Sequence, residues 1–253
     1  MSRDERPLEA GLTPPSEPAD EAVAAIATSP LEMLGLLPNS SNYTFLVRAD
    51  APSGPVLAVY KPHRGESPLW DFDEGSLGRR EVAAFVIADA LGWPNVPPTL
   101  LRDGPEGPGS VQLFVPFEPR EHYFTLQQRF AEEFRAIAAF DLIVNNADRK
   151  GGHCLLGEDG RVWAIDHGVC FHAEPKLRTV IWEYIGEPIP GHLVDAVAAL
   201  RERLGEGAPL RRTLEDLLDS AEIVALVRRL DAIVASPVFP PPSGDRPYPW
   251  PPV

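Results

Sequence analysis

The segment at residues 145–153 contains the residue types that a phosphoryl-transfer site needs. It reads Asn-Asn-Ala-Asp-Arg-Lys-Gly-Gly-His, and Ala-Ile-Asp-His-Gly follows at residues 164–168. Phosphoryl transfer uses one carboxylate to orient an acceptor hydroxyl and a second to hold a divalent cation that carries nucleotide phosphates. Asp148 and Asp166 would supply them. The alternative is a surface hairpin with ordinary turn carboxylates, which does not account for so many Asp, Asn, Arg and His residues beside apolar strands.

A hairpin is predicted between these two segments. Asp159-Gly160 separates two short apolar runs, residues 154–156 and 162–165. An Asp-Gly pair favours a two-residue turn because both residues tolerate positive φ. In that register, Leu155 lies opposite Ala164.

The same register places His153 opposite Asp166. Directly opposed residues point to the same face of a sheet, with Cβ atoms ~5 Å apart. Asp148 precedes the hairpin, and Gly151 and Gly152 allow the intervening backbone to turn closely. We therefore expect Asp148, His153 and Asp166 to converge on one spot.

These residues resemble the catalytic loop and metal-binding segment of phosphoinositide-kinase-like and HipA-like kinases. In those enzymes an Asp-Arg loop carries the catalytic Asp and a later Ile-Asp-x-Gly segment binds metal, which matches Asp148-Arg149 and residues 165–168 here. From about Gly35 to about Leu230 the chain is similar to a group of actinobacterial proteins described as phosphatidylinositol 3-/4-kinase-like. The resemblance implies an α+β, two-lobed protein-kinase-like fold, with a strand-rich N-lobe and a mainly helical C-lobe.

Lys61 ends an apolar strand predicted at residues 55–61, and residues 43–48 read as the strand before it. From the sequence alone, a solvated lysine at a sheet edge would explain this position. The strand is similar to the Val-Ala-x-Lys strand of kinases. That resemblance implies that Lys61 holds the nucleotide phosphates.

A helix is predicted at residues 76–91, with Glu81 inside its apolar stripe. A buried carboxylate needs a cation. Lys61 is the favoured candidate, as in the strand-lysine to helix-glutamate pair of active kinases, and we group Glu81 with the nucleotide-binding residues on that ground. Arg80, close to the same stripe, is the local alternative.

The resemblance implies two further nucleotide-contacting segments. A polar turn at residues 39–42 would cover the phosphates with backbone N–H groups, and residues 114–117 would form the hinge that pairs with adenine. An ordinary hairpin loop and an ordinary buried strand end fit these stretches equally well. The residues assigned to nucleotide binding in these segments are Ser40, Ser41, Asn42, Phe114, Val115 and Phe117.

The expected reaction is in-line transfer of the ATP γ-phosphoryl group to a hydroxyl acceptor. Asp148 would orient or deprotonate the acceptor. Arg149 and Lys150 would stabilise charge in the transition state, because a loose transition state spreads charge over oxygens that cations can contact. The alternative for both is an exposed basic turn.

His153 departs from the pattern of related kinases, which usually carry Asn five residues after the catalytic Asp. A neutral imidazole can ligate a divalent cation together with Asp166, but it suits softer ions than Mg²⁺. The cation is therefore Mg²⁺ or Mn²⁺. The alternative is a buried His153 that only hydrogen-bonds Asp166.

Other function classes remain open at this point. A nucleotide-binding pseudokinase would keep Lys61 and Asp166 without turnover, and an AMP transferase would move a different part of ATP. A metal-dependent phosphatase would not need Lys61 and Glu81. The acceptor is expected to be a small polyol or a protein rather than a lipid.

Composition limits the partners. The chain has 253 residues, of which 44% are hydrophobic, enough for one large core or two lobes. A formal net charge of −14 argues against nucleic acid or an anionic bilayer as the main partner. No apolar run approaches the ~20 residues that span a membrane, and no signal peptide is evident. Cys154 and Cys170 read as reduced thiols, so a cytoplasmic location is expected.

The chain is expected to divide into four parts. Residues 1–29 are an acidic, Pro-rich extension with a short helix at 21–28, residues 30–117 form the N-lobe, and residues 118–236 form the C-lobe. Helices are predicted around residues 130–138, 190–204 and 210–235 of the C-lobe. Residues 237–253 are a Pro-rich tail. That tail is a candidate ligand for a partner domain, with packing on its own surface or disorder as alternatives.

Overall fold

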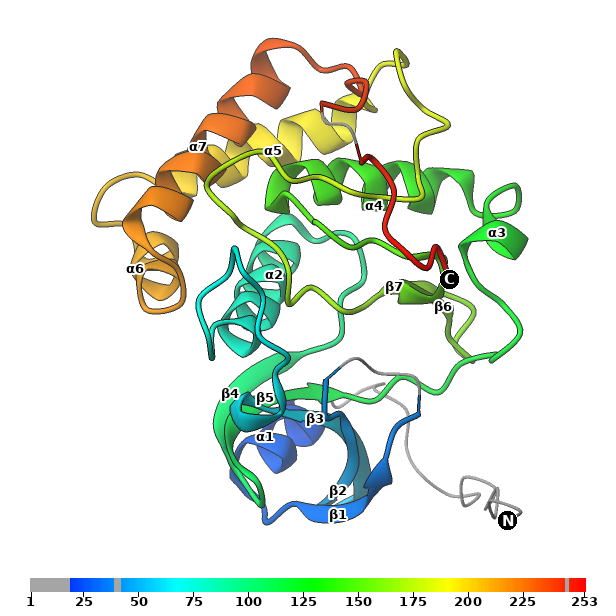
Figure 1. The fold of residues 1–253 in the computed structure, drawn as a ribbon, viewed down its shortest axis with the longest axis vertical. Coiled ribbons are helices and arrows are strands. Elements are labelled where there is room, and N and C mark those ends of the chain that lie inside the picture. Colours follow the sequence, from blue (N-terminus) through cyan, green and yellow to red (C-terminus); the bar gives the residue numbers. More distant parts are fainter. Residues whose placement is uncertain (1–18, 39–41, 244–245) are drawn as a thin grey trace.

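The computed structural model describes residues 19–38, 42–243 and 246–253. These residues form two lobes, one built on a five-stranded sheet and one mainly of helices, which confirms the predicted α+β, two-lobed architecture (Figure 1). The N-lobe contains α1 (Ala19–Thr28), β1 (Glu32–Leu36), β2 (Phe45–Ala51), β3 (Gly54–Pro62), α2 (Leu77–Leu91), β4 (Thr99–Gly104) and β5 (Gly107–Leu113). The C-lobe contains α3 (Tyr123–Leu126), α4 (Ala131–Val144), β6 (Cys154–Leu156), β7 (Val162–Ala164), α5 (Gly191–Arg203), α6 (Pro209–Glu215) and α7 (Ser220–Ala235).

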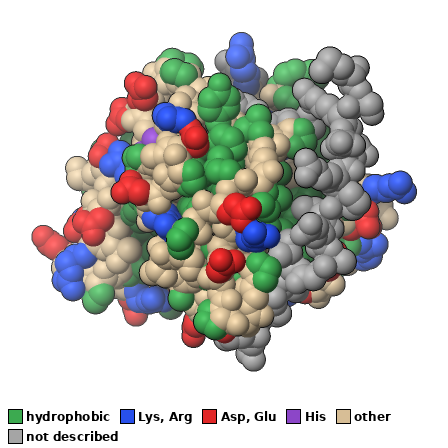
Figure 2. Space-filling model, turned by 90° about the horizontal axis from the view of Figure 1, so that it is seen from below, with side chains coloured by type: hydrophobic (Ala, Val, Ile, Leu, Met, Phe, Trp, Pro, Cys, Tyr) green, Lys and Arg blue, Asp and Glu red, His purple; other side chains and the backbone are tan. Residues whose placement is uncertain are grey.

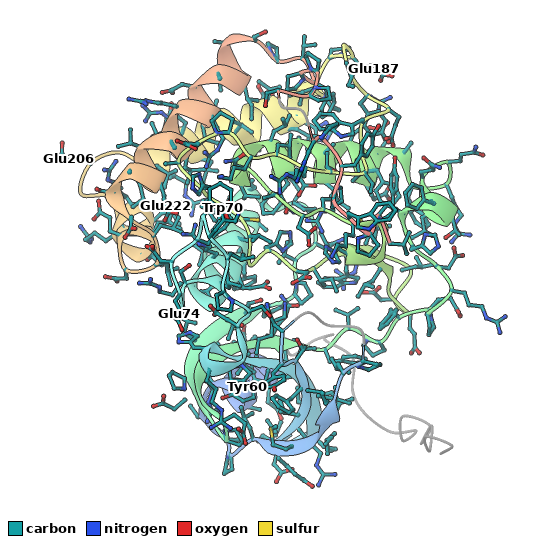
Figure 3. All side chains as sticks on the ribbon, in the orientation of Figure 1. Tyr60, Trp70, Glu74, Glu187, Glu206 and Glu222 are labelled. Atoms are coloured by element: carbon teal, nitrogen blue, oxygen red, sulfur yellow. The ribbon has the colours of Figure 1, made fainter. Side chains whose placement is uncertain are left out.

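The N-lobe sheet is antiparallel, with strand order β1-β2-β3-β5-β4. Two-residue turns join β2 to β3 and β4 to β5, since Ala51 pairs with Gly54 and Gly104 with Gly107. The central strand, β3, ends with Lys61 and Pro62, so the sheet places that lysine at the edge facing the C-lobe. Tyr60, its neighbour, points the other way into the N-lobe core (Figure 3).

Helix α1 covers the N-lobe sheet. The helix predicted at residues 21–28 is present and begins two residues earlier. Its Ala25 and Ile26 are buried against Val47 and Ala58 of the sheet. These residues, which we assigned to an N-terminal extension, therefore contribute to the N-lobe core because the helix has one apolar side to bury.

Helix α2 belongs to the larger, C-lobe core. Ala84, Ile87 and Ala88 are buried in the same cluster as residues of α4, α5 and α7. The helix ends at Gly92, whose φ of +76° suits glycine and whose N–H caps the carbonyl of Ala88. Glu81, in the second turn of α2, consequently lies between the two lobes.

The C-lobe helices follow the sequence prediction with one correction. A single helix was predicted at residues 210–235, but the structure divides it into α6 and α7. Asp219 starts α7, and its backbone N–H bonds the Glu222 carboxylate at 3.0 Å. This reciprocal contact at a helix start explains the break, because Asp three residues before Glu favours a new N-terminus.

The surface shows no unusual composition on the face that Figure 2 draws. Seen from the N-lobe end, acidic, basic and hydrophobic side chains are interspersed (Figure 2). None of the described helices combines the length and the apolar character that crossing a membrane requires.

Candidate active site between the lobes

The predicted hairpin is present, but its register differs by one residue. Leu155 lies opposite Trp163 rather than Ala164. The connecting loop has three residues, 158–160, because the N–H of Gly157 bonds the carbonyl of Arg161 at 2.9 Å. Gly160, the third loop residue, has a φ of +76°. A three-residue loop with glycine in the left-handed region is a common alternative to the two-residue turn that we predicted.

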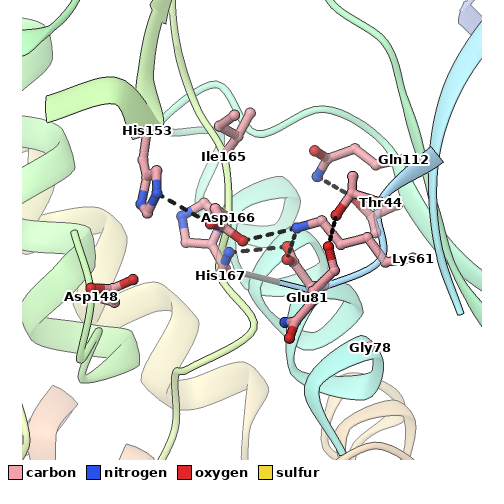
Figure 4. Close-up of polar contacts among 12 residues, drawn as sticks. Thr44, Lys61, Gly78, Glu81, Gln112, Asp148, His153, Ile165, Asp166 and His167 are labelled. Atoms are coloured by element: carbon pink, nitrogen blue, oxygen red, sulfur yellow. Dashed lines mark hydrogen bonds and ion pairs between the residues drawn. The ribbon is translucent and has the colours of Figure 1, made fainter. Parts of the chain in front are cut away.

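His153 and Asp166 nevertheless meet. The His153 Nε2 to Asp166 Oδ2 distance is 3.1 Å (Figure 4). In the observed register His153 lies beside Ile165, whose N–H bonds the His153 carbonyl at 3.0 Å. Asp166 has a φ of +61°, so the backbone leaves strand geometry at this residue. The contact therefore depends on a local turn at Asp166 and not on the flat pairing that the prediction assumed.

Lys61 joins the two lobes through its ammonium group. Its Nζ lies 2.5 Å from Glu81 Oε1 and 2.9 Å from Asp166 Oδ1 (Figure 4). The Lys61 side chain is 23% exposed, whereas Glu81 is buried, so Lys61 is not the solvated edge lysine of the alternative interpretation.

Arg80 does not satisfy Glu81. Its guanidinium pairs with Glu222 of α7 at 2.6 Å and donates to the carbonyl of Cys170 at 2.7 Å. Figure 3 labels Glu222 on the side of α7 that faces α2. Two neighbouring charges on α2 thus have separate partners. Glu81 pairs with a lysine of the N-lobe sheet, and Arg80 pairs with a glutamate of the C-lobe.

Glu81 also fixes the segment that follows Asp166. Its second oxygen, Oε2, accepts the backbone N–H of His167 at 3.0 Å. A Cβ on Gly168 would lie 3.4 Å from Leu77 and 3.6 Å from Glu81, so this segment runs close against α2. Helix α2 therefore sets the position of Asp166 as well as that of Lys61.

The three charges shift one another's pKa values. Desolvation acts to lower the pKa of Lys61, but Asp166 and Glu81 outweigh it and raise that pKa above its ordinary value. Desolvation acts to raise the pKa of Asp166, but Lys61 and His153 hold it well below the ordinary range. The pKa of Glu81 is raised, first by burial and also by Asp166. Lys61 thus stays protonated and Asp166 stays ionised at neutral pH.

His153 is neutral at neutral pH. Burial is the main cause that lowers its pKa to about 4, and Arg149 and Lys150 add to the effect. Its Nδ1 accepts the backbone N–H of Lys150 at 3.4 Å, so the Nε2 proton points at Asp166. This is the hydrogen bond expected in the alternative interpretation, in which His153 only hydrogen-bonds Asp166 and does not bind a metal.

The same two groups also suit a divalent cation. Two neighbouring ligands of an octahedral Mg²⁺, each at 2.0–2.1 Å, lie about 3.0 Å apart. His153 Nε2 and Asp166 Oδ2 are 3.1 Å apart, and the Asp166 side chain is 44% exposed. Within the described part of the chain, no group of three or more His, Cys, Asp or Glu residues could hold a metal by itself. The residues therefore fit a cation that takes most of its ligands from phosphates and water.

Asp148 faces the same region from the catalytic loop (Figure 4). Its Oδ2 lies 3.1 Å from Lys150 Nζ, and its backbone N–H bonds Asn146 Oδ1 at 3.0 Å. Burial raises the pKa of Asp148, with Lys150 opposing the shift and Asp166 adding to it. Lys150 is 22% exposed and covers the carboxylate, so the exposed basic turn of the alternative interpretation does not describe it.

Arg149 does not have the role that we expected. It is fully buried, and its guanidinium binds Asp141 of α4 with Nε–Oδ2 at 3.0 Å. It also donates to the carbonyls of His153 and Ile165, at 3.2 and 2.9 Å, and contacts His167 Nε2 at 2.6 Å. No donor is left for a phosphate, so Arg149 anchors the candidate catalytic loop, residues 145–153, to the segment around Asp166.

The sequence analysis missed two members of this anchor, Asp141 and His167. Asp141 follows Ile137 and Ala138 by four and three residues, inside the apolar stripe of α4, so the signal that identified Glu81 was present here too. Burial lowers the pKa of His167 well below its ordinary value, and Arg149 adds to the shift. Its neutral ring accepts from Arg149 and packs edge-on against Phe140.

An apolar cluster lies beside the charged groups. Its members are Val115, Leu155, Trp163, Phe117 and Ile165. Of the residues expected at the hinge, Val115 is buried in this cluster, Phe117 packs against it, and Phe114 contacts Phe117 at a ring distance of 6.3 Å.

The polar turn before β2 is only partly described. Ser40 and Ser41 lie outside the described residues. Asn42 accepts the backbone N–H of Ser67 through its side-chain oxygen at 2.7 Å. The Asn42 side chain therefore contacts the segment that precedes α2.

Comparisons with known proteins identify the family. A family model described as phosphatidylinositol 3- and 4-kinase matches residues 100–225. Protein Rv2133c of Mycobacterium tuberculosis is 39% identical over 267 residues, covering 92% of this chain and 95% of that protein. The chain belongs to the phosphatidylinositol 3- and 4-kinase-like superfamily. Membership makes it a kinase-like phosphotransferase.

Two further similarities are with a plant kinase and a solved kinase structure. Phosphatidylinositol 4-kinase gamma 4 of Oryza sativa subsp. japonica is 32% identical over 130 residues, 44% of this chain and 23% of that protein. The Helicobacter pylori proinflammatory kinase CtkA has a similar structure, with a TM-score of 0.54 and 10% identity over 83% of this chain and 93% of that one. At that identity, the structural likeness supports the kinase fold alone.

Proposed function

We propose that this member of the phosphatidylinositol 3- and 4-kinase-like superfamily transfers the γ-phosphoryl group of ATP to a hydroxyl acceptor. The observation that carries the proposal is the contact of Lys61 with both Glu81 and Asp166, at 2.5 and 2.9 Å. A lysine held by a buried carboxylate, next to an accessible second carboxylate, provides one fixed cation for phosphates and one ligand for a metal.

The nucleotide would lie across the two lobes. Lys61 would contact its phosphates, and the apolar cluster around Val115 and Leu155 would receive the base. Residues 114–117 follow β5 and pass beside this cluster, which supports their assignment as the hinge. Ser40, Ser41 and Asn42 remain proposed as the turn that covers the phosphates.

Asp148 would accept the acceptor proton. The acceptor oxygen forms a bond to the γ-phosphorus while the bond from that phosphorus to the β–γ bridging oxygen breaks, and ADP leaves. A carboxylate whose pKa is raised by burial is a better base than a solvated one. Lys150 now pairs with Asp148, so acceptor binding would free the carboxylate and leave the lysine close to the transferred group.

His153 and Asp166 would hold Mg²⁺ or Mn²⁺, which neutralises phosphate charge during transfer. The imidazole ligand favours Mn²⁺ relative to an amide oxygen at this position. His153 would have to turn its Nε2 lone pair toward the cation. That requires the proton to move to Nδ1 and the bond from the Lys150 N–H to be given up.

The acceptor that we propose is a small polyol or a protein. The formal net charge of −14 would repel an anionic lipid surface. The substrate in the name of the Oryza relative is therefore not carried over to this chain.

Transfer of label from ATP tests the proposal. The purified protein is incubated with γ-labelled or α-labelled ATP, with Mg²⁺ or Mn²⁺, and with candidate polyols and proteins. We expect γ-label on an acceptor. Asp148→Asn should bind ATP normally but lose turnover, whereas Lys61→Ala should lose binding. Full turnover by Asp148→Asn would contradict the mechanism.

A nucleotide-binding pseudokinase is the second candidate. Both oxygens of Asp166 already have protein partners, Lys61 and His153, which would also stabilise a site without a metal. Binding of ATP without transfer of either label would support this candidate. Transfer of the α-label would instead indicate an AMP transferase.

A further inference from the structure

The tail segment, residues 246–253, lies against the catalytic loop. It runs down the C-lobe and ends next to β6 (Figure 1). The N–H of Gly151 bonds the carbonyl of Pro252 at 2.8 Å, and the N–H of Thr179 bonds the carbonyl of Pro247 at 3.0 Å. The indole N–H of Trp182 reaches the same Pro247 carbonyl at 3.2 Å. We define Gly151, Thr179 and Trp182 as the tail-binding surface.

The tail-binding surface flanks Asp148 directly. Gly151 follows Asp148 by three residues. Thr179 lies beside Arg149 in a parallel bridge of the backbone. The backbone N–H of Arg149 donates to the Arg178 carbonyl at 3.0 Å, and the Arg149 carbonyl accepts the Val180 N–H at 3.1 Å. Any chain that rests on these donors therefore passes along the loop that carries Asp148.

The surface recognises backbone and not side chains. All three hydrogen bonds end on main-chain carbonyls of tail prolines. Proline has a carbonyl but no N–H, and extended proline-rich chains leave their carbonyls free, so a surface that offers only donors matches them. The loop glycines leave room for this approach, because a Cβ on Gly151 would lie 2.9 Å from Phe124 and 3.4 Å from the Pro252 oxygen.

The tail segment is held by few apolar contacts. Tyr248, Trp250 and Val253 are 58%, 87% and 55% exposed, and Pro249 is its one buried residue. A segment with little buried apolar area opens at low free-energy cost. The tail can therefore be displaced without unfolding the C-lobe.

We propose that the tail segment is an internal ligand of the acceptor side of the site, and that the natural acceptor is an extended polypeptide that replaces it. This rests on the proposed phosphoryl transfer. A polypeptide presents the carbonyls that Gly151, Thr179 and Trp182 bind, whereas a small polyol would not bond all three donors at once. The tail then limits access to Asp148 until a polypeptide competes for the same donors.

The first measurement follows docking of the tail and does not depend on activity. Hydrogen exchange at the Gly151 amide is compared in the unchanged protein, in Trp182→Phe and in Trp70→Phe. The first variant removes one donor to Pro247, while the second makes the same change at a side chain that is 89% exposed and outside this surface. We expect exchange about fivefold faster in Trp182→Phe only. Equal exchange in all three proteins would overturn the proposal.

The second measurement uses γ-labelled ATP with dephosphorylated casein or myo-inositol. Trp182→Phe removes a donor from the acceptor as well as from the tail, so this measurement uses Pro249→Ala, which shortens the one buried side chain of the tail and keeps all three donors. Exchange at Gly151 and transfer to casein should both be about fivefold faster in Pro249→Ala than in the unchanged protein and in Trp70→Phe, at unchanged ATP affinity. The peptide Arg-Pro-Tyr-Pro-Trp-Pro-Pro-Val, the tail sequence, should inhibit that transfer. Equal casein labelling despite faster Gly151 exchange, or labelling of myo-inositol alone, would overturn the polypeptide assignment. Absence of label on any acceptor in all three proteins would instead contradict the phosphotransferase proposal itself, and the acceptor assignment with it.

Discussion

Arg149 and Asp141 form a fully buried ion pair that connects the catalytic loop to helix α4. The same guanidinium binds the carbonyls of His153 and Ile165, and thereby holds the two halves of the site together. The loop that carries Asp148 is therefore positioned by a buried charge whose donors are all bonded to other protein groups.

Breaking this pair should destabilise the protein strongly. Asp141→Asn leaves the guanidinium buried without its counter-charge, and we expect a loss of about 3–5 kcal/mol in the free energy of unfolding. Denaturant titration measures it. The double variant Asp141→Leu, Arg149→Met should lose less stability than the more damaging of the two single variants Asp141→Leu and Arg149→Met. If the double variant lost as much as the two single variants added together, the ion pair would not be the source of the effect.

Removal of the Glu81 charge should weaken nucleotide binding. In Glu81→Gln the ammonium of Lys61 keeps only Asp166, and the His167 N–H loses a charged acceptor. We expect ATP affinity to fall about tenfold, since a hydrogen bond to a charged group contributes about 1.5–3 kcal/mol. Calorimetric titration provides the measurement. Glu74→Gln, an exposed position ahead of α2, is the matched control and should bind as the unchanged protein does.

His153 should make stability depend on pH. Its pKa is about 4 in the folded protein and about 6.5 in the unfolded chain. Between these values the unfolded chain binds more protons, so the free energy of unfolding rises with pH from 4 to 6.5 and falls as the pH is lowered through that window. His153→Asn should reduce this slope, while His192→Asn, at an exposed position, should preserve it. Identical slopes in all three proteins would show that His153 does not titrate in this way.

The same substitution should change the preferred cation. An amide oxygen is a harder ligand than an imidazole nitrogen, so His153→Asn should raise turnover with Mg²⁺ relative to Mn²⁺. The ratio of initial rates with the two metals is the quantity to compare. An unchanged ratio would indicate that His153 is a hydrogen-bond partner of Asp166 and not a ligand.

Much of the site could be predicted because its signals are local in the sequence. Glu81 was found as a charge inside an apolar stripe, and Lys61 as the end of an apolar strand. Asp141 carries the same signal as Glu81. Asp141 was not predicted because the resemblance to kinases implied a catalytic role for Arg149, which is its buried partner.

Other features depended on contacts that one sequence does not encode visibly. The hairpin register differs by one residue from the predicted one because the loop has three residues, with Gly160 in the left-handed region. His153 still contacts Asp166 because the positive φ of Asp166 turns the backbone there. Two of the three donors that hold the tail are backbone N–H groups, which are present at every residue except proline and so leave no signal in the sequence.

Helix α2 is packed into the C-lobe core while its Glu81 is held by a lysine of the N-lobe. Lys61 thus joins the N-lobe sheet to α2 and to the segment around Asp166 through ionic contacts. We expect opening for nucleotide exchange to become faster at high ionic strength, since dissolved ions compete for the separated charges.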